Sequence, residues 1–84
     1  MNKETRKKVR LIVRAFLCAN KGKSYTSKEL CEFVNSNDFG VGDGVMSAEM
    51  GRALNGDYCW RHNIDRVRSS GRNVWHYSVG GDGL

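Results

Sequence analysis

The amino-acid sequence predicts an α+β domain in which three helices precede a two-stranded antiparallel β-hairpin. Two patterns support this fold class: apolar residues recur at helical spacing in three stretches, and they alternate with polar residues in the last third of the chain. A chain of 84 residues, 39% of them hydrophobic, is expected to enclose only one core. We therefore expect a single domain over residues 1–84, with an ordered part of about 4–79 and a flexible tail at 80–84.

The first helix is predicted over residues 4–20. Its apolar side follows the i, i+3, i+4, i+7 spacing of an amphipathic helix, with Val9, Ile12, Val13 and Phe16. On the opposite side Lys7, Arg10 and Arg14 form a cationic stripe, which is either a solvated face or a contact for phosphate groups. A second, narrower apolar strip consists of Leu11, Ala15 and Cys18. We expect this strip to pack within the domain, with a homodimer contact as the alternative.

A second helix is predicted over residues 27–36. The run TSKE fits a capping box, in which Thr26 caps the helix and Glu29 reaches back to the backbone. The connection that follows, SNDFGVGDGV at 36–45, is rich in glycine. It lacks the Gly-Lys-Ser/Thr ending of a phosphate loop and the closing Glu of a calcium loop, so we expect a flexible connection without a ligand.

The third helix is predicted over residues 46–55, MSAEMGRALN. Ser47 is the expected N-cap and Gly56 the expected C-terminal stop, with residues 57–63 as a connection. Met50, Ala53 and Leu54 fall on one side of this helix, whereas Glu49, Arg52 and Asn55 fall on the other. Such a helix can dock on a core and still present an exposed face.

Two strands, at 64–68 and 73–79, are predicted to form the hairpin around a turn that contains Gly71. Trp75, Tyr77 and Val79 alternate with Val74, His76 and Ser78, which is the pattern of a strand with one buried face. Arginines gather toward the tip of the hairpin, at Arg66, Arg68 and Arg72. The aromatic base is therefore expected to anchor in the core and the tip to reach into solvent.

This order of elements resembles the winged helix-turn-helix superfamily of DNA-binding domains, over roughly residues 4–79. The resemblance rests on TSKELCEFV, MSAEMGRALN and IDRVRSSGRNVWHY, which stand at the places of the second helix, the recognition helix and the wing. It implies that helix 46–55 reads the major groove of double-stranded DNA while the 64–79 hairpin contacts the backbone or minor groove. The connection 36–45 is longer than the tight turn of the motif.

Individual side chains can then be given roles. On helix 46–55, Arg52 can pair with guanine, Asn55 with adenine, and Ser47 can donate to a phosphate. Glu49 can read a cytosine amino group or simply complement the helix dipole. The candidate backbone and minor-groove contacts are Arg66, Arg68 and Arg72 of the hairpin, and Lys7, Arg10 and Arg14 of the first helix.

Composition bounds the function. Fourteen Lys and Arg against nine Asp and Glu give a net charge of +5, which favours a polyanionic partner. Three cysteines without repeated spacing indicate reduced thiols, and no apolar run reaches the ~20 residues of a membrane span. We expect a small cytoplasmic, nucleoid-associated transcriptional regulator that is not an enzyme, needs no cofactor and does not bind membranes. The alternative is a protein-interaction module, such as a mobile-element inhibitor or adaptor, because the fold serves both functions.

Two further constellations carry less weight. Cys59 and His62 could join other cysteines or His76 in a zinc site, but no second close pair accompanies them, so we expect no metal. The aromatic residues Tyr58, Trp60, Trp75 and Tyr77 could stack on single-stranded nucleic acid, although aromatic stripes on strands more often belong to the core. Clustering of the cations on one face would favour DNA, whereas scattering would favour the interaction module.

Overall fold

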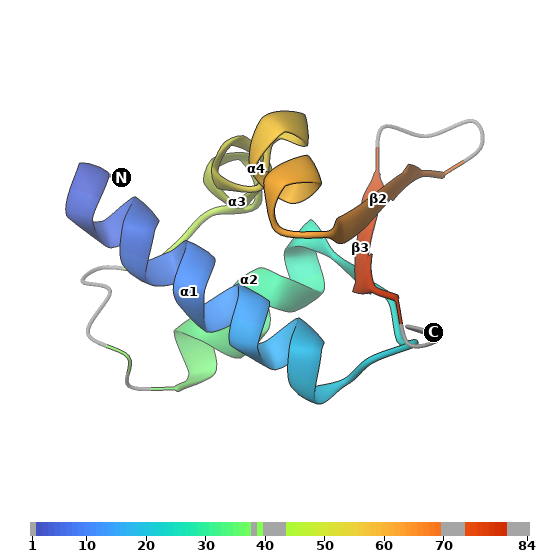
Figure 1. Ribbon diagram of the computed structural model, residues 1–84. Helices are drawn as coiled ribbons and strands as arrows, with labels where there is room; N and C mark the ends of the chain where they lie inside the picture. The colour runs from blue at the N-terminus through green and yellow to red at the C-terminus, as the bar shows by residue number, and fades with distance from the viewer. Residues whose placement is uncertain (1, 38, 40–43, 70–73, 81–84) are drawn as a thin grey trace.

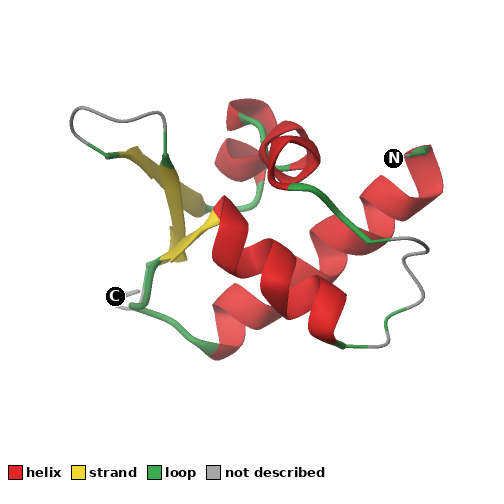
Figure 2. Ribbon diagram, turned by 180° about the vertical axis from the view of Figure 1, so that it is seen from behind, coloured by secondary structure: helices red, strands yellow, loops and turns green. Residues whose placement is uncertain are grey.

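The computed structural model describes residues 2–37, 39, 44–69 and 74–80, in which four helices gather on one side of a small antiparallel sheet (Figures 1 and 2). In chain order the elements are α1 (Lys3–Ala19), β1 (Tyr25–Thr26), α2 (Ser27–Ser36), α3 (Ser47–Ala53), α4 (Gly56–Arg61), β2 (Ile64–Arg68) and β3 (Trp75–Val79). The sheet order is β1-β3-β2. Among the described helices, none is long and apolar enough to cross a membrane.

The core lies where α1, α2 and α3 meet the central strand β3. Its largest fully buried side chains are Tyr77, Leu17, Leu30, Met50, Leu54, Val9, Val13 and Val34. The predicted apolar side of the first helix is confirmed, since Val9 and Val13 are buried while Ile12 and Phe16 pack against the core. Phe16 also stacks on Phe33 of α2, with ring centroids 4.1 Å apart. These contacts fix how α1 crosses α2.

The predicted boundaries of α1 and α2 are confirmed to within about a residue. The capping box of α2 is present: the Thr26 amide donates to Glu29 Oε1 at 2.8 Å, and the Glu29 amide donates to Thr26 Oγ1 at 3.2 Å. Beyond α1, Gly22 adopts the left-handed conformation with φ +85°. Its amide donates to Val79 O at 3.1 Å, which ties the end of the first helix to the sheet.

The sheet has three strands rather than the two that the sequence predicted. Tyr25 pairs with Tyr77 and Thr26 with His76, so β1 adds an edge to the hairpin. Two residues are too few to show an alternating pattern, and β1 exists because β3 offers it a backbone ladder. The hairpin itself is confirmed, with Arg66 opposite Tyr77 in β2 and β3. Its turn at 70–73, including Arg72, and the tail at 81–84 lie outside the described residues.

The third predicted helix is shorter than expected and is followed by another. α3 ends at Ala53, and its N-cap position is Met46 rather than Ser47. Gly56 does not stop a helix but begins α4, within the stretch expected to be a connection. Asn55 makes this possible because its Oδ1 accepts the Tyr58 amide at 2.9 Å. An asparagine cap satisfies an amide that the first turn leaves unpaired.

The strip of Leu11, Ala15 and Cys18 does not pack within the domain, contrary to the prediction. All three residues are exposed, and Leu11 keeps 66% of its surface in solvent. The reason is that α1 meets the rest of the domain along one side only, where Val9, Val13 and Leu17 are buried. The exposed strip therefore remains on the outer surface of α1.

The long connection between α2 and α3 is fastened at its far end. The Asn35 side chain donates through Nδ2 to Val45 O at 2.9 Å and accepts the Val45 amide on Oδ1 at 2.8 Å. Val45 is itself buried in the core. This paired contact sets where the chain enters α3, although residues 38 and 40–43 lie outside the described residues.

Candidate nucleic-acid interface

The helix α3 docks as predicted and leaves one side exposed. Met50, Ala53 and Leu54 are fully buried. Ala48 and Arg52 lie on the exposed side, and the half-buried Gly51 lies beside them. The outer side of α3 therefore consists of small residues with one cation, Arg52, near its C-terminal end.

A groove runs beside this outer side, between the start of α2 and the end of β3 that adjoins the hairpin turn. We call it the α3 groove; it has a volume of about 520 Å³ and is lined by Thr26, Ser27, Lys28, Ser47, Ala48, Gly51, Val74 and Trp75. Hydroxyl groups and one lysine thus face a floor of small residues. These are groups that can donate hydrogen bonds to phosphate oxygens.

Gly51 is unusual in this groove because the fold does not need it. A Cβ atom built on Gly51 would have no heavy atom of the described chain within 4 Å apart from its chain neighbours and the backbone of its own helix, and its φ is not in the left-handed region. Glycine inside a helix costs about 1 kcal/mol relative to alanine. A glycine without an internal reason is common where the backbone and a ligand approach closely.

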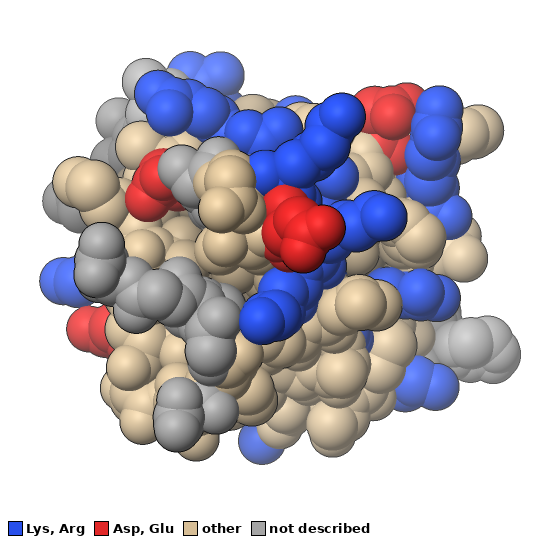
Figure 3. Space-filling view, turned by 90° about the vertical axis from the view of Figure 1, so that its left-hand side faces the viewer, with Lys and Arg blue, Asp and Glu red and all other residues tan. Residues whose placement is uncertain are grey.

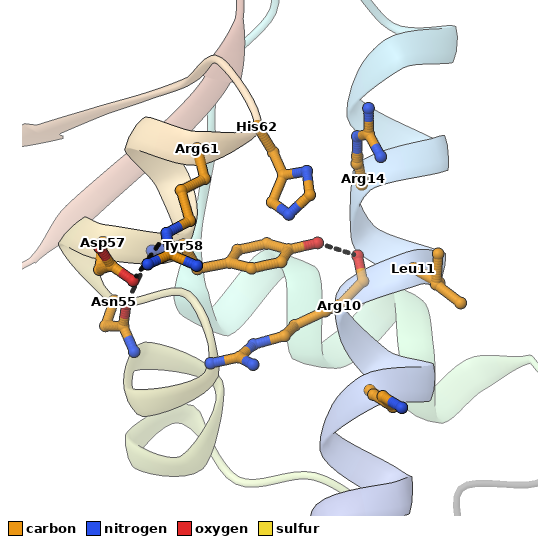
Figure 4. A pocket seen from close by; sticks show the side chains of 9 residues that line it. Arg10, Leu11, Arg14, Asn55, Asp57, Tyr58, Arg61 and His62 are labelled. Atoms are coloured by element: carbon orange, nitrogen blue, oxygen red, sulfur yellow. Dashed lines mark hydrogen bonds and ion pairs between the residues drawn. The ribbon is translucent and has the colours of Figure 1, made fainter.

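A second groove lies between α1 and α4, and Figure 4 shows its lining. We call it the α1–α4 groove; it has a volume of about 550 Å³ and is lined by Lys7, Arg10, Leu11, Arg14, Asn55, Asp57, Tyr58, Arg61 and His62. Cations from both helices therefore face one hollow. The sequence predicted the contribution of α1 to this cluster but not that of α4.

Tyr58 and Arg10 form the fixed part of the α1–α4 groove. Tyr58 donates from its hydroxyl to Arg10 O at 3.2 Å, and the Arg10 guanidinium lies over the tyrosine ring, 4.7 Å from its centroid. Arg10 Nε also donates to Ala53 O at 2.7 Å, which ties α1 to the end of α3. Burial raises the pKa of Tyr58, against the opposing charges of Arg14 and Arg10. Arg10 is thus partly a structural residue.

The four site residues predicted on helix 46–55 have different surroundings. Two have side chains that can face a ligand, and the other two have side chains that hydrogen-bond to the backbone. Ser47 lines the groove and Arg52 is exposed. Glu49 accepts the Met46 amide at 3.2 Å, the helix-start role that was the simpler of its two predicted roles. Asn55 lies outside α3, and besides capping α4 it donates through Nδ2 to Arg52 O at 3.3 Å. The amide that adenine recognition requires is therefore engaged within the chain.

The arginines of the hairpin do not all lie at its tip. The Arg66 guanidinium lies over the Trp75 ring, 3.9 Å from its centroid, and a Cβ on Gly56 would approach its Nη2 to 3.2 Å. Arg66 is thus packed between the sheet and the start of α4, which corrects its expected place near the solvent-facing tip. Arg68 is exposed at the end of β2, opposite Trp75.

The cations are split between surfaces rather than gathered on one. Lys7, Arg10 and Arg14 share the α1–α4 groove with Arg61, whereas Arg52 lies on the outer side of α3. Figure 3 shows Lys and Arg side chains crowded on the side of the molecule that carries the start of α1, with acidic residues among them. The clustering that would favour DNA is therefore present for α1 but does not include Arg66 and Arg68, the arginines in the described part of the hairpin.

Two residues that the sequence did not predict for this site complete the α1–α4 groove: Arg61, the last residue of α4, and His62, its C-cap. A signal for α4 was present: Asn55 can cap a helix, Asp57 stands in its first turn, and Arg61 follows Asp57 at i+4. The structure shows this pair as an ion pair, with Arg61 Nε 3.2 Å from Asp57 Oδ2. The large side chains of Tyr58 and Trp60, one on each side of Cys59, obscured the helical pattern.

The other two constellations do not form sites in the described parts of the chain. No three His, Cys, Asp or Glu side chains there lie close enough together to hold a metal ion. The aromatic platform is not formed, because Tyr77 is fully buried and Arg66 covers Trp75, while Trp60 is 81% exposed on α4. Cys31 and Cys59 are buried and Cys18 is exposed, all as free thiols.

The two grooves offer different chemical groups to a ligand. The α3 groove offers small residues, hydroxyl groups and a neighbouring arginine, and the α1–α4 groove offers a cationic rim. Comparison of the chain with protein-family models, with curated proteins and with solved structures gave no match.

Proposed function

We propose that this protein is a winged-helix domain that binds double-stranded DNA through the outer side of α3, as a small transcriptional regulator. Its chain order supports this, since a helix, a short strand, two helices and a hairpin follow one another with only α4 added. The sheet order β1-β3-β2 places the hairpin beside the α3 groove, because Val74 and Trp75 line one wall of it. In such domains a helix enters the major groove.

The observation that carries the proposal is that small side chains cover the exposed outer side of α3. Gly51 and Ala48 let another molecule approach the helix backbone closely, and Gly51 has no internal reason in the described chain. Ser47, Thr26 and Lys28 surround these small residues with groups that can hold phosphate oxygens. The helix is held rigidly from behind by Met50 and Leu54, so its position relative to a ligand is fixed.

Base reading falls to Arg52 in this proposal. It is exposed on the helix that would enter the groove, and an arginine pairs with the O6 and N7 of guanine through two hydrogen bonds. Arg68 and Arg72 of the hairpin are the proposed contacts with the neighbouring backbone. The net charge of +5 supplies the long-range attraction.

The test is a titration of labelled duplex DNA at two salt concentrations, with a matched pair of variants. Affinity should fall steeply as salt rises, because each phosphate contact releases counterions. Ala48→Glu places a carboxylate on the outer side of α3 and should weaken binding about tenfold or more. Ala15→Glu makes the same change on the exposed side of α1 and should alter affinity much less. Binding that is absent, insensitive to salt or equally affected by both variants would overturn the proposal.

A further inference from the structure

The outer side of α1 combines exposed apolar residues with cations. Leu11, Ala15 and Cys18 recur at i, i+4 and i+7 and are all exposed. Lys7 and Arg14 are exposed and line the α1–α4 groove with Leu11. One side of a helix therefore offers an aliphatic strip with positive charge beside it. None of these side chains is needed for the core.

The charge of the α1–α4 groove is unbalanced. Lys7, Arg10, Arg14 and Arg61 are its cations, and Asp57 is the one carboxylate among the residues that line it. Asp57 is already engaged by Arg61, with Nε and Oδ2 3.2 Å apart. The rim is thus complementary to a partner with several negative charges.

Stacked nucleic-acid bases do not suit this groove. The ring of Tyr58 lies between two other groups (Figure 4): Arg10 is 4.7 Å from its centroid, and the His62 ring centroid is 4.4 Å from it. Base stacking needs an open aromatic face, which Tyr58 does not offer. The exposed Leu11 at the rim also favours an aliphatic contact rather than a sugar-phosphate backbone.

We propose that the α1–α4 groove and the adjoining strip of α1 dock an acidic amphipathic segment of a partner protein. Aliphatic side chains of that segment lie on Leu11, Ala15 and Cys18, as in the packing of an amphipathic helix into a groove. Its carboxylates face Lys7, Arg14 and Arg61. This docking surface is separate from the α3 groove, so the inference does not rest on DNA binding.

The experiment uses a fluorescein-labelled synthetic helix that carries Leu on one side and Glu beside it. Its anisotropy is measured with the wild-type protein and with Arg14→Glu and Lys23→Glu. Both variants reverse one exposed charge, but only Arg14 lines the groove. Arg14→Glu should lower the affinity about tenfold, as expected when an attractive charge at an interface rim becomes repulsive, and Lys23→Glu about twofold or less.

The position of the bound helix is tested independently by the reactivity of Cys18, the exposed one of the three free thiols. The bound helix should slow alkylation of Cys18, and unlabelled duplex DNA should not displace it. The inference would be overturned if Arg14→Glu and Lys23→Glu lowered the affinity equally. It would also be overturned if a control helix with Ser in place of Leu bound as tightly, because either result would show that only non-specific charge attraction holds the helix. Displacement of the helix by duplex DNA would likewise overturn the inference, because the groove would then be a nucleic-acid contact. So would the absence of any binding of the helix to the folded protein.

Discussion

Asn55 shows at the scale of one residue that a side chain predicted to read a base can also have a structural role. Its Oδ1 accepts the Tyr58 amide at 2.9 Å and so begins α4. Asn55→Ala should therefore lower the free energy of unfolding by about 1 kcal/mol, whereas Asn55→Asp should preserve it because a carboxylate also caps. Urea unfolding of both variants measures this. A normal stability for Asn55→Ala together with lost DNA affinity would instead make Asn55 a base-reading residue.

The two buried thiols, Cys31 and Cys59, should make the domain less stable at alkaline pH. Burial raises the pKa of Cys31 and, likewise, that of Cys59 above the ordinary value. Below about pH 9 both the folded and the unfolded chain keep these protons, and the stability is fully present. As the pH rises further the unfolded chain releases protons that the folded chain retains, so the free energy of unfolding falls.

Urea unfolding at about pH 8 and about pH 10 checks this direction, since proton release by the unfolded state alone must lower stability. The double variant with Ala in place of Cys31 and Cys59 is the control, and its pH dependence should be weaker. In the native wild-type protein Cys18 should react with a thiol reagent well before the other two cysteines. Stability that stays constant or rises with pH would contradict the burial of these thiols.

At the scale of elements, two glycines should respond in opposite ways to the same substitution. Gly51 lies inside α3 and Gly22 beyond α1 at φ +85°, and neither has a heavy atom of the described chain within 4 Å of an added Cβ. Gly51→Ala should raise the free energy of unfolding by up to about 1 kcal/mol, through helix propensity. Gly22→Ala should lower it by about 1 kcal/mol, because the left-handed conformation is strained for alanine.

Thermal and urea unfolding measure the stability of the two variants. A titration with duplex DNA measures their affinity for DNA. Gly51→Ala should weaken DNA binding even as it stabilises the helix, because the added methyl group narrows the α3 groove. If Gly51→Ala destabilised the domain, the glycine would have a structural role, and it would lose its value as a sign of ligand approach.

The elements that sequence predicted well are those whose signals are local. Periodicity and capping residues predicted α1 and α2, and alternation predicted the hairpin. The strand β1 was missed because its two residues become a strand only through pairing with Tyr77 and His76. The helix α4 was missed although Asn55 and Asp57 signalled its start.

The candidate site was predictable only in part, for a similar reason. The cationic stripe of α1 follows from helical geometry. That Arg61 lines the same groove depends on tertiary packing between residues far apart in the chain. Arg66 was expected to reach solvent, yet the register of β2 and β3 brings it over Trp75. No local pattern encodes a contact across two strands and a helix.

For the whole molecule, the division of charge between two surfaces is the main consequence of the fold. The α3 groove is lined by small and hydroxyl-bearing residues with one lysine, whereas four cations, Lys7, Arg10, Arg14 and Arg61, line the α1–α4 groove. We have proposed DNA as the ligand of the first surface and an acidic protein segment as the ligand of the second. The two activities should then be separable by mutation, with Ala48→Glu affecting the first and Arg14→Glu the second.

The most direct test of DNA binding through α3 is a chemical-shift titration of the ¹⁵N-labelled protein with duplex DNA. The proposal predicts that the amides of Ala48, Gly51 and Arg52 move, together with those at the start of α2 and those of Val74 and Trp75 beside the hairpin turn. The amides of Arg61 and His62 should move little. Shifts confined to α1 and α4, or no shifts in low salt, would contradict DNA binding through α3.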